Sequence, residues 1–344
     1  MRPLLGHIIR TAALGVAGVA ACASIASADD ERHGDRDFDR VIVIVMENHG
    51  FDNVIGGLDP RDPSGTKLVT PFITQLALNS GLGTYYFGVT HPSLPNYLSM
   101  IAGDFFGVHD DNDSCFNPAH GANCHGFDVP NLVDQLEARH ISWESLNQTM
   151  PSVGFLGSRF PTTGPTLYAQ KHNPFVYFKD IALDPSRLAK IKPFDLGQLQ
   201  AELASPATAS RFIYLVPDQC NDQHGTTGCN ADDATILANG DAFLAKTVPV
   251  IVGSRAFTEK SVLFIVWDED DFGSNLSCCG EPGIGGGHVA TIAVTKGGSP
   301  VKNAAPTNHF SLLATIEDGF GLPRLANAKT ANTLFGAIPV DHGE

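Results

Sequence analysis

Carboxylate, amide and imidazole side chains follow three strongly apolar runs of this sequence. They are Glu47, Asn48 and His49 after residues 41–45, Asp222 and His224 after residues 212–216, and Asp268 and Glu269 after residues 261–267. Oxygen and imidazole ligands of these kinds bind divalent cations in proteins. The consecutive carboxylates at 268–271 would repel one another unless a cation or solvent offsets their charge. Because they follow a buried run, we favour a metal site over a solvated acidic loop.

Ser93 is the candidate nucleophile. It lies in the segment Thr90–Tyr97, where Pro95 suits the first turn of a helix because proline has no N–H and a helical φ. Ser93 would then lie close to a helix N-terminus, whose free N–H groups and dipole favour an anion. A serine there can be a mere N-cap. The alternative is a hydroxyl group aimed at a phosphate.

These side chains need a framework that brings distant segments together. The runs at 41–45, 83–88, 211–216, 261–267 and 289–295 predict strands. Helical segments at 70–80, 98–103, 194–203, 234–247 and 308–317 alternate with them, which predicts an α/β fold with a parallel sheet covered on both faces. Ligands bind where the strands of such sheets end. We therefore expect convergence of Glu47, Asn48, Ser93, Asp222, His224, Asp268, Glu269 and His288.

Composition and the N-terminal segment point to export. The chain has 344 residues and a formal net charge of −15, without the Lys and Arg clusters that nucleic-acid binding needs. A basic start, an apolar stretch and the small residues at 26–28 predict a signal peptide over 1–28, leaving 29–344 as one domain. The apolar stretch is too short for a membrane span. The residues before Cys22 also resemble a lipid-attachment box, but we favour a secreted or periplasmic protein.

The remaining six cysteines agree with an oxidising compartment. Cys115 and Cys124 enclose eight residues, as do Cys220 and Cys229, which favours two local disulfides. The adjacent cysteines at 278 and 279 could bridge each other or pair elsewhere. The first pair lies in an irregular segment, 105–127, which we interpret as an insertion loop beside the site.

The combination of cation ligands with a hydroxyl nucleophile suits hydrolysis of a phosphate ester, since metals offset phosphoryl charge and activate the attacking group. The order of motifs also resembles a known family. The motifs are Glu47–Asn48, Thr90–Tyr97, Asn221–His224, Trp267–Asp271, Gly287–Val289 and His309–Leu313. They are similar to those of the bacterial secreted acid phosphatase and phosphoesterase family, a branch of the alkaline-phosphatase superfamily related to bacterial phospholipases C. The resemblance implies a three-layer α/β/α sandwich with a mostly parallel central sheet.

The resemblance further implies roles for individual residues. Ser93 would form a phospho-serine, and His91, Asn96 and His288 would contact the substrate. The metal ligands would be Glu47, Asn48, Asp268, Glu269, Asp222 and His224. His288, like Asp222 and His224, also falls where the superfamily places ligands of a second metal. Because Glu269 and Asp222 stand where histidines are expected, one or two ions of Ca, Mg, Zn or Fe fit the pattern.

The favoured function is therefore a secreted, monomeric, metal-dependent acid phosphatase acting on small or lipid phosphate monoesters, phosphoinositides among them. One alternative is a phospholipase C-like phosphodiesterase whose pocket is shaped by residues 105–127. Another is an exported, non-catalytic cation-binding protein, which would have no need for Ser93. We assign no catalytic role to His172, a histidine in the polar-aromatic segment 168–178, or to His49.

Overall fold

The apolar runs form the centre of a mixed sheet. Strands β1 (Arg40–Met46), β7 (Phe212–Val216) and β8 (Ser261–Trp267) are buried at every position, as expected for strands covered on both faces. β1 lies between the other two and is parallel to both, with Val43 opposite Phe264 on one side and Tyr214 on the other. The three strands that carry the predicted cation ligands are therefore neighbours.

The structure is a computed structural model that describes residues 37–229, 232–279 and 285–340. The predicted signal peptide at 1–28 and the lipid-attachment site at Cys22 lie outside the described residues. The described residues all belong to one compact unit. The single domain over 29–344 and its boundary at residue 28 remain predictions.

The sheet has the order β10-β2-β9-β8-β1-β7-β3-β6, and β11 also pairs with β2. The outer strands are β2 (Gly81–Phe87), β3 (Trp143–Asn147), β6 (Ile191–Pro193), β9 (His288–Thr295), β10 (Val301–Asn303) and β11 (Thr307–Asn308). Among the strands described for this sheet, β9 alone is antiparallel to its neighbours. Its reversal brings the amino end of β9 to the edge where the parallel strands end.

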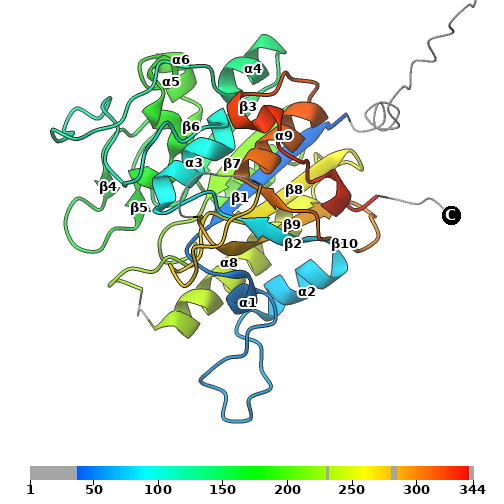
Figure 1. The fold of residues 1–344 in the computed structure, drawn as a ribbon. Helices are drawn as coiled ribbons and strands as arrows, with labels where there is room; N and C mark the ends of the chain where they lie inside the picture. Colours follow the sequence, from blue (N-terminus) through cyan, green and yellow to red (C-terminus); the bar gives the residue numbers. More distant parts are fainter. Residues whose placement is uncertain (1–36, 230–231, 280–284, 341–344) are drawn as a thin grey trace, which may run out of the picture. The chain divides into compact units, whose positions relative to one another are not determined.

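Helices cover both faces of this sheet (Figure 1). Helices α3 (Ser93–Ala102) and α9 (His309–Gly319) pack together on one face, and α2 (Pro71–Asn79) packs with α8 (Asp233–Val252) on the other. The shorter helices are α1 (Phe51–Val54), α4 (Leu132–Ala138), α5 (Lys179–Ala182), α6 (Pro185–Leu188) and α7 (Leu196–Glu202). The predicted three-layer sandwich with a mostly parallel sheet is confirmed.

Two helices differ from the sequence-based boundaries. α3 begins at Ser93 rather than at Leu98, because the first turn accommodates Pro95 without loss of a hydrogen bond. α8 continues to Val252 although it contains Pro249. By length and composition α8 could cross a membrane, but half of its most apolar window is buried inside the protein, as in a core helix.

The irregular loop at 105–127 contains no helix or named strand, as predicted, and carries the disulfide Cys115–Cys124. Cys220 and Cys229 form the second predicted bridge. The adjacent pair is resolved as a bridge between Cys278 and Cys279. The segment 168–178 contains β5 (Tyr168–Ala169), which pairs with β4 (Arg159–Phe160), and two 3-10 turns, η1 (Gln170–His172) and η2 (Pro174–Tyr177).

Candidate active site

Carboxylates from three adjacent strand ends meet at one edge of the sheet. Glu47 directly follows β1, Asp268 and Glu269 follow β8, and Asp222 lies in the loop after β7; all four are buried. Backbone hydrogen bonds hold the loops together, since Glu47 N donates to Asp222 O at 2.8 Å and Asp268 N donates to Met46 O at 3.0 Å. The convergence expected for parallel strand ends is therefore present for these carboxylates.

Ser93 lies between these carboxylates at the first residue of α3. Its Oγ donates to Glu47 Oε2 at 3.1 Å and to Glu269 Oε1 at 3.0 Å, as alternative acceptors for one hydroxyl proton. Tyr97, one turn along the same helix, donates its hydroxyl group to Glu47 Oε1 at 2.6 Å. Ser93 is fully buried and has no side-chain capping role, because the N-cap residue of α3 is Pro92.

Asn48 and His91 flank this centre. The Asn48 backbone N donates to Asp268 Oδ1 at 3.2 Å, and this residue has a left-handed φ of 53°. His91 Nδ1 lies 2.5 Å from Glu269 Oε2, and its ring stacks on Phe272 with centroids 4.2 Å apart. Burial alone would lower the pKa of His91, but Glu269 outweighs it and the pKa is raised. The imidazolium can therefore donate to Glu269.

Two histidines complete a ligand group with Glu47. Ligand atoms of Glu47, His172 and His224 lie within 4.8 Å of one another and form a possible metal site. His172 Nε2 lies 3.1 Å from Glu47 Oε1, yet the angle does not make a hydrogen bond. Burial lowers the pKa of His172 well below its usual range, so the ring is neutral. His224 Nδ1 donates to the Gly225 carbonyl at 2.8 Å, which leaves Nε2 as the atom with a lone pair.

Lys171 brings a positive charge into the same centre. Its Nζ donates to Asp111 Oδ2 at 2.9 Å and lies 3.3 Å from Ser93 Oγ and 3.4 Å from His224 Nε2. Sequence reasoning missed Lys171 and Asp111 and gave His172 no catalytic role. The segment that carries Lys171 and His172 is irregular, and no strand end or ligand spacing marked it as part of the site. The cluster of Lys171, His172 and Asn173 before a proline was the only signal available.

Burial dominates the titration of the carboxylates. It raises the pKa of Glu47, and that of Glu269 to about 7, because a buried carboxylate loses its hydration. Burial also raises the pKa values of Asp222 and Asp268, and repulsion from Glu47 adds to the effect. Such a group of like charges is stable only if cations or protons offset it.

Several buried polar atoms of this centre have no hydrogen-bond partner. They are Asn48 Oδ1, Asp222 Oδ2, Asp268 Oδ2 and His172 Nε2. Unpaired buried polar atoms are costly, and carbonyl, carboxylate and neutral imidazole atoms are all metal ligands. The residues present therefore fit a divalent cation. The candidate ligands fall into two overlapping sets that share Glu47. One set adds Asn48, Asp268 and Glu269, which follow β1 and β8. The other adds Asp222 and His224, which follow β7, and His172, which lies in η1.

Asn96, His288 and His49 lie outside this group of candidate ligands. Asn96 gives its side-chain amide to the backbone of the preceding loop, with Oδ1 accepting from Val89 N and Thr90 N. His288 Nε2 lies 3.1 Å from the Thr84 carbonyl. Its ring packs against the rings of Phe51, Tyr85 and Phe87 instead of contacting the carboxylates. His49 is buried beside the Glu47 carbonyl and reaches Asp233 at 3.3 Å. The structure thus brings together Glu47, Asn48, Ser93, His91, Asp222, His224, Asp268 and Glu269, but not Asn96 or His288.

Solved structures of other proteins share this fold. A protein in the alkaline phosphatase superfamily from Vibrio parahaemolyticus superposes with a TM-score of 0.55 at 11% identity, covering 86% of this chain and 70% of that one. The lipoteichoic acid synthase LtaP from Listeria monocytogenes gives 0.53 at 9% identity, with coverages of 89% and 79%. At such low identity these likenesses establish the fold.

Relatives are recognisable in sequence as well. A phosphate-repressible acid phosphatase of Penicillium chrysogenum is 28% identical over 289 residues, which is 84% of this chain and 60% of that protein. A phosphatidylinositol-3-phosphatase of Mycobacterium tuberculosis is 28% identical over 294 residues, with coverages of 86% and 81%. The chain spans about three-fifths of the length of the fungal relatives it matches. The model of the phosphoesterase family matches residues 66–323, well over half of the chain, and this protein therefore belongs to the phosphoesterase family.

Proposed function

We propose that this protein is a secreted, metal-dependent phosphatase that hydrolyses phosphate monoesters through a phospho-serine on Ser93. One observation carries the proposal. The Ser93 hydroxyl group is fully buried at the N-terminus of α3, hydrogen-bonded to the carboxylates of Glu47 and Glu269. A serine in this setting has two acceptors for its proton and a helix terminus that favours an anionic substrate.

The proposed reaction has two displacements at phosphorus. In the first, the Ser93 proton passes to a neighbouring carboxylate oxygen, the Oγ–P bond forms, and the ester P–O bond breaks opposite it. The alcohol leaves and takes up a proton from solvent. In the second, water attacks phosphorus and releases a proton to solvent, and the Oγ–P bond breaks. Ser93 Oγ regains its proton from the carboxylate as inorganic phosphate leaves.

A divalent cation held by residues of this centre would offset charge on the phosphoryl oxygens and favour ionisation of the attacking hydroxyl group. The residues that would bind it are Asn48, Asp268 and Glu269 on one side and Asp222, His172 and His224 on the other, with Glu47 common to both. The protein's own contribution is positional. Tyr97 and the α3 backbone fix Glu47 and Ser93 relative to each other.

The substrate class follows from relatives named as phosphatases. The mycobacterial relative is named for a phosphoinositide substrate and is matched over most of its length. We therefore include phosphoinositide head groups beside small monoesters. Turnover of p-nitrophenyl phosphate should exceed that of bis(p-nitrophenyl) phosphate and of phosphatidylcholine. The opposite ranking would favour the phospholipase C-like alternative.

Substitution of the nucleophile tests the proposal. Ser93→Ala should lose nearly all monoesterase turnover, by roughly 10³-fold or more, since removal of a covalent nucleophile leaves only the electrostatic part of catalysis. Ser99→Ala is the matched control, because Ser99 lies in the same helix and its Oγ only donates to the Pro95 carbonyl. Circular dichroism should show both variants folded. Full turnover by Ser93→Ala, or none by the wild type with any divalent cation, would reject the function.

A further inference from the structure

Two charged residues lie close to Ser93 and take no part in the proposed reaction. Asp111 belongs to the disulfide-bearing loop at 105–127, and Lys171 belongs to η1. Lys171 Nζ and Asp111 Oδ2 form an ion pair at 2.9 Å. The Asp111 side chain is 31% exposed and the Lys171 side chain 18%. An ion pair of this kind is weak evidence for stability. Its position beside the nucleophile points instead to a role in binding.

The Lys171 ammonium lies beside the nucleophile. Its Nζ is 2.9 Å from Asp111 Oδ2 and 3.3 Å from Ser93 Oγ. A compact ammonium is a common ligand of phosphate oxygens.

The Asp111 carboxylate bridges two donors on either side of the nucleophile. Oδ1 accepts from Leu94 N at 3.0 Å, and this amide belongs to the residue that follows Ser93 in the first turn of α3. Oδ2 accepts from Lys171 Nζ, which itself lies 3.3 Å from Ser93 Oγ. A phosphoryl group joined to Ser93 would present oxygens to the same amide and the same ammonium. The carboxylate thus satisfies an amide and an ammonium that both belong to the surroundings of the nucleophile.

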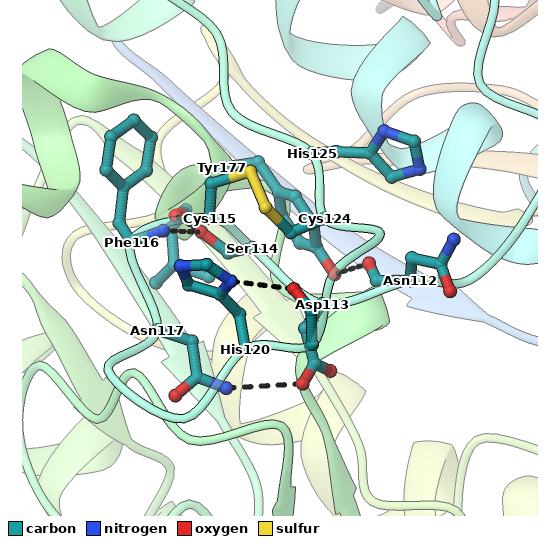
Figure 2. Close-up of a disulfide and its surroundings, with 12 residues drawn as sticks. Asn112, Asp113, Ser114, Cys115, Phe116, Asn117, His120, Cys124, His125 and Tyr177 are labelled. Carbon is teal, nitrogen blue, oxygen red and sulfur yellow. Dashed lines mark hydrogen bonds between the residues drawn. A yellow bond between two sulfur atoms is a disulfide. The ribbon is translucent and has the colours of Figure 1, made fainter.

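The loop that carries Asp111 is braced against the segment that carries Lys171. Figure 2 shows Cys115–Cys124 with Tyr177, whose hydroxyl group donates to the Asn112 carbonyl at 3.0 Å. Next to it, Ser114 Oγ donates to the Val176 carbonyl at 2.6 Å. The backbone after Asp111 is thereby fixed to residues 176 and 177. The Asp111 side chain is 31% exposed, so its carboxylate borders solvent as well as its two donors.

We propose that the Leu94 amide and the Lys171 ammonium form a binding site for phosphoryl oxygens, which the Asp111 carboxylate occupies until a phosphoryl group displaces it. The inference rests on the proposed function for its choice of ligand, but it concerns binding and not turnover. Asp111 then competes with phosphate for these two donors. It keeps two donors satisfied in the free protein and lowers the affinity for phosphate, the product that must leave.

Binding of inorganic phosphate tests the inference. Isothermal titration of the protein, in the divalent cation that supports turnover, should give a Kd roughly tenfold lower for Asp111→Asn, because the competing charge is gone while an oxygen remains for Leu94 N. Lys171→Met should raise the Kd by about 10- to 100-fold, as expected for loss of a charged hydrogen bond. Lys171→Arg should recover part of the loss. If Lys171→Met does not fold, Lys171→Gln takes its place.

A second ion pair supplies matched controls. Lys179 Nζ and Asp128 Oδ2 are 2.8 Å apart, and both side chains are exposed at 53% and 75%. Lys179→Met and Asp128→Asn should leave phosphate binding unchanged. Weaker or unchanged binding in Asp111→Asn, or unchanged binding in both Lys171→Met and Lys171→Gln, would overturn the inference.

The two proposals fail separately. Absence of turnover on every monoester, with phosphate binding that responds to Lys171 and Asp111 as expected, would reject the function and leave the binding site. Turnover that requires Ser93, with phosphate binding indifferent to Lys171, would reject the binding site alone.

Discussion

A single buried amide holds the nucleophile loop in place. Asn96 is fully buried in α3, and its Oδ1 accepts from Val89 N at 2.8 Å and Thr90 N at 3.1 Å. Its Nδ2 donates to the Thr90 carbonyl at 2.6 Å and to the Pro92 carbonyl at 3.2 Å. These bonds tie the end of β2 to the start of α3, where Ser93 lies. Asn96 therefore acts on the position of Ser93 and uses all of its polar atoms to do so.

The substitution Asn96→Ala should destabilise the protein more than it weakens phosphate binding. Removal of the amide leaves buried backbone donors and acceptors without partners, which costs roughly 1–3 kcal/mol for each unsatisfied group and a total of about 2–4 kcal/mol after relaxation. Urea unfolding should show a lower midpoint, and kcat should fall with KM nearly unchanged. Unaltered stability together with a raised Kd for phosphate would restore the predicted contact between Asn96 and substrate.

Residue type and strand position predicted the carboxylates, but not the role of each polar residue. Glu47, Asp268 and Glu269 follow buried strands, so the end of each strand fixes their place. Asn96 is a polar residue close to Ser93, as a substrate ligand would be, yet its side-chain amide is hydrogen-bonded to the backbone. His172 sits in an irregular segment, where no periodicity relates sequence position to direction. Only tertiary contacts bring its ring to Glu47.

At the scale of an element, α9 carries a buried carboxyl group outside the site. Glu317 is fully buried, its Oε1 accepts from Leu325 N at 2.8 Å, and its Oε2 has no hydrogen-bond partner. Burial raises the pKa of Glu317 from 4.5 to about 8. The folded state therefore favours the neutral acid, whereas the unfolded chain ionises near pH 4.5. The stabilising contribution of this proton is complete below that pH and is lost as the pH rises through 8.

The variant Glu317→Gln should remove this part of the pH dependence. An amide keeps an oxygen for Leu325 N and carries no charge, so it resembles the protonated acid. Between pH 5 and pH 8.5 the wild type should lose up to about 4 kcal/mol of unfolding free energy that the variant retains. Urea unfolding at several pH values measures the difference. Parallel curves for the two proteins would show that Glu317 is ionised in the fold.

Strands were easier to predict than their directions. The runs that form β1, β7 and β8 are mostly apolar and rich in β-branched and aromatic residues, which is the pattern of strands covered on both faces. The run that forms β9 also predicts a strand, but its antiparallel course depends on the connection from β8. Local sequence does not encode that connection. The reversal does bring His288 to the edge where the parallel strands end, but its ring packs among aromatic side chains, which the sequence did not indicate.

At the scale of the whole molecule, carboxylates follow each of the three central strands of the sheet. Glu47, Asp222, Asp268 and Glu269 are each at most 1% exposed, so the edge of the core that they share crowds four buried carboxyl groups together. The overall charge of −15 adds a weaker repulsion that salt would screen. A cation bound by loops after β1, β7 and β8 would connect the centre of the sheet. Its removal should therefore destabilise the entire fold.

We expect the melting temperature to depend on divalent cations. At a free concentration 100-fold above Kd, an ion that binds only the folded state adds about 2.7 kcal/mol, which corresponds to a rise of several degrees in Tm. Titration after treatment with EDTA, followed by elemental analysis, measures this rise. Glu47→Gln should abolish it, because Glu47 belongs to both candidate ligand sets. His172→Asn should weaken metal binding, whereas His49→Asn should preserve it, since the His49 ring contacts only the Glu47 carbonyl and Asp233. An equal rise in Glu47→Gln and the wild type would show that the stabilising cation binds elsewhere.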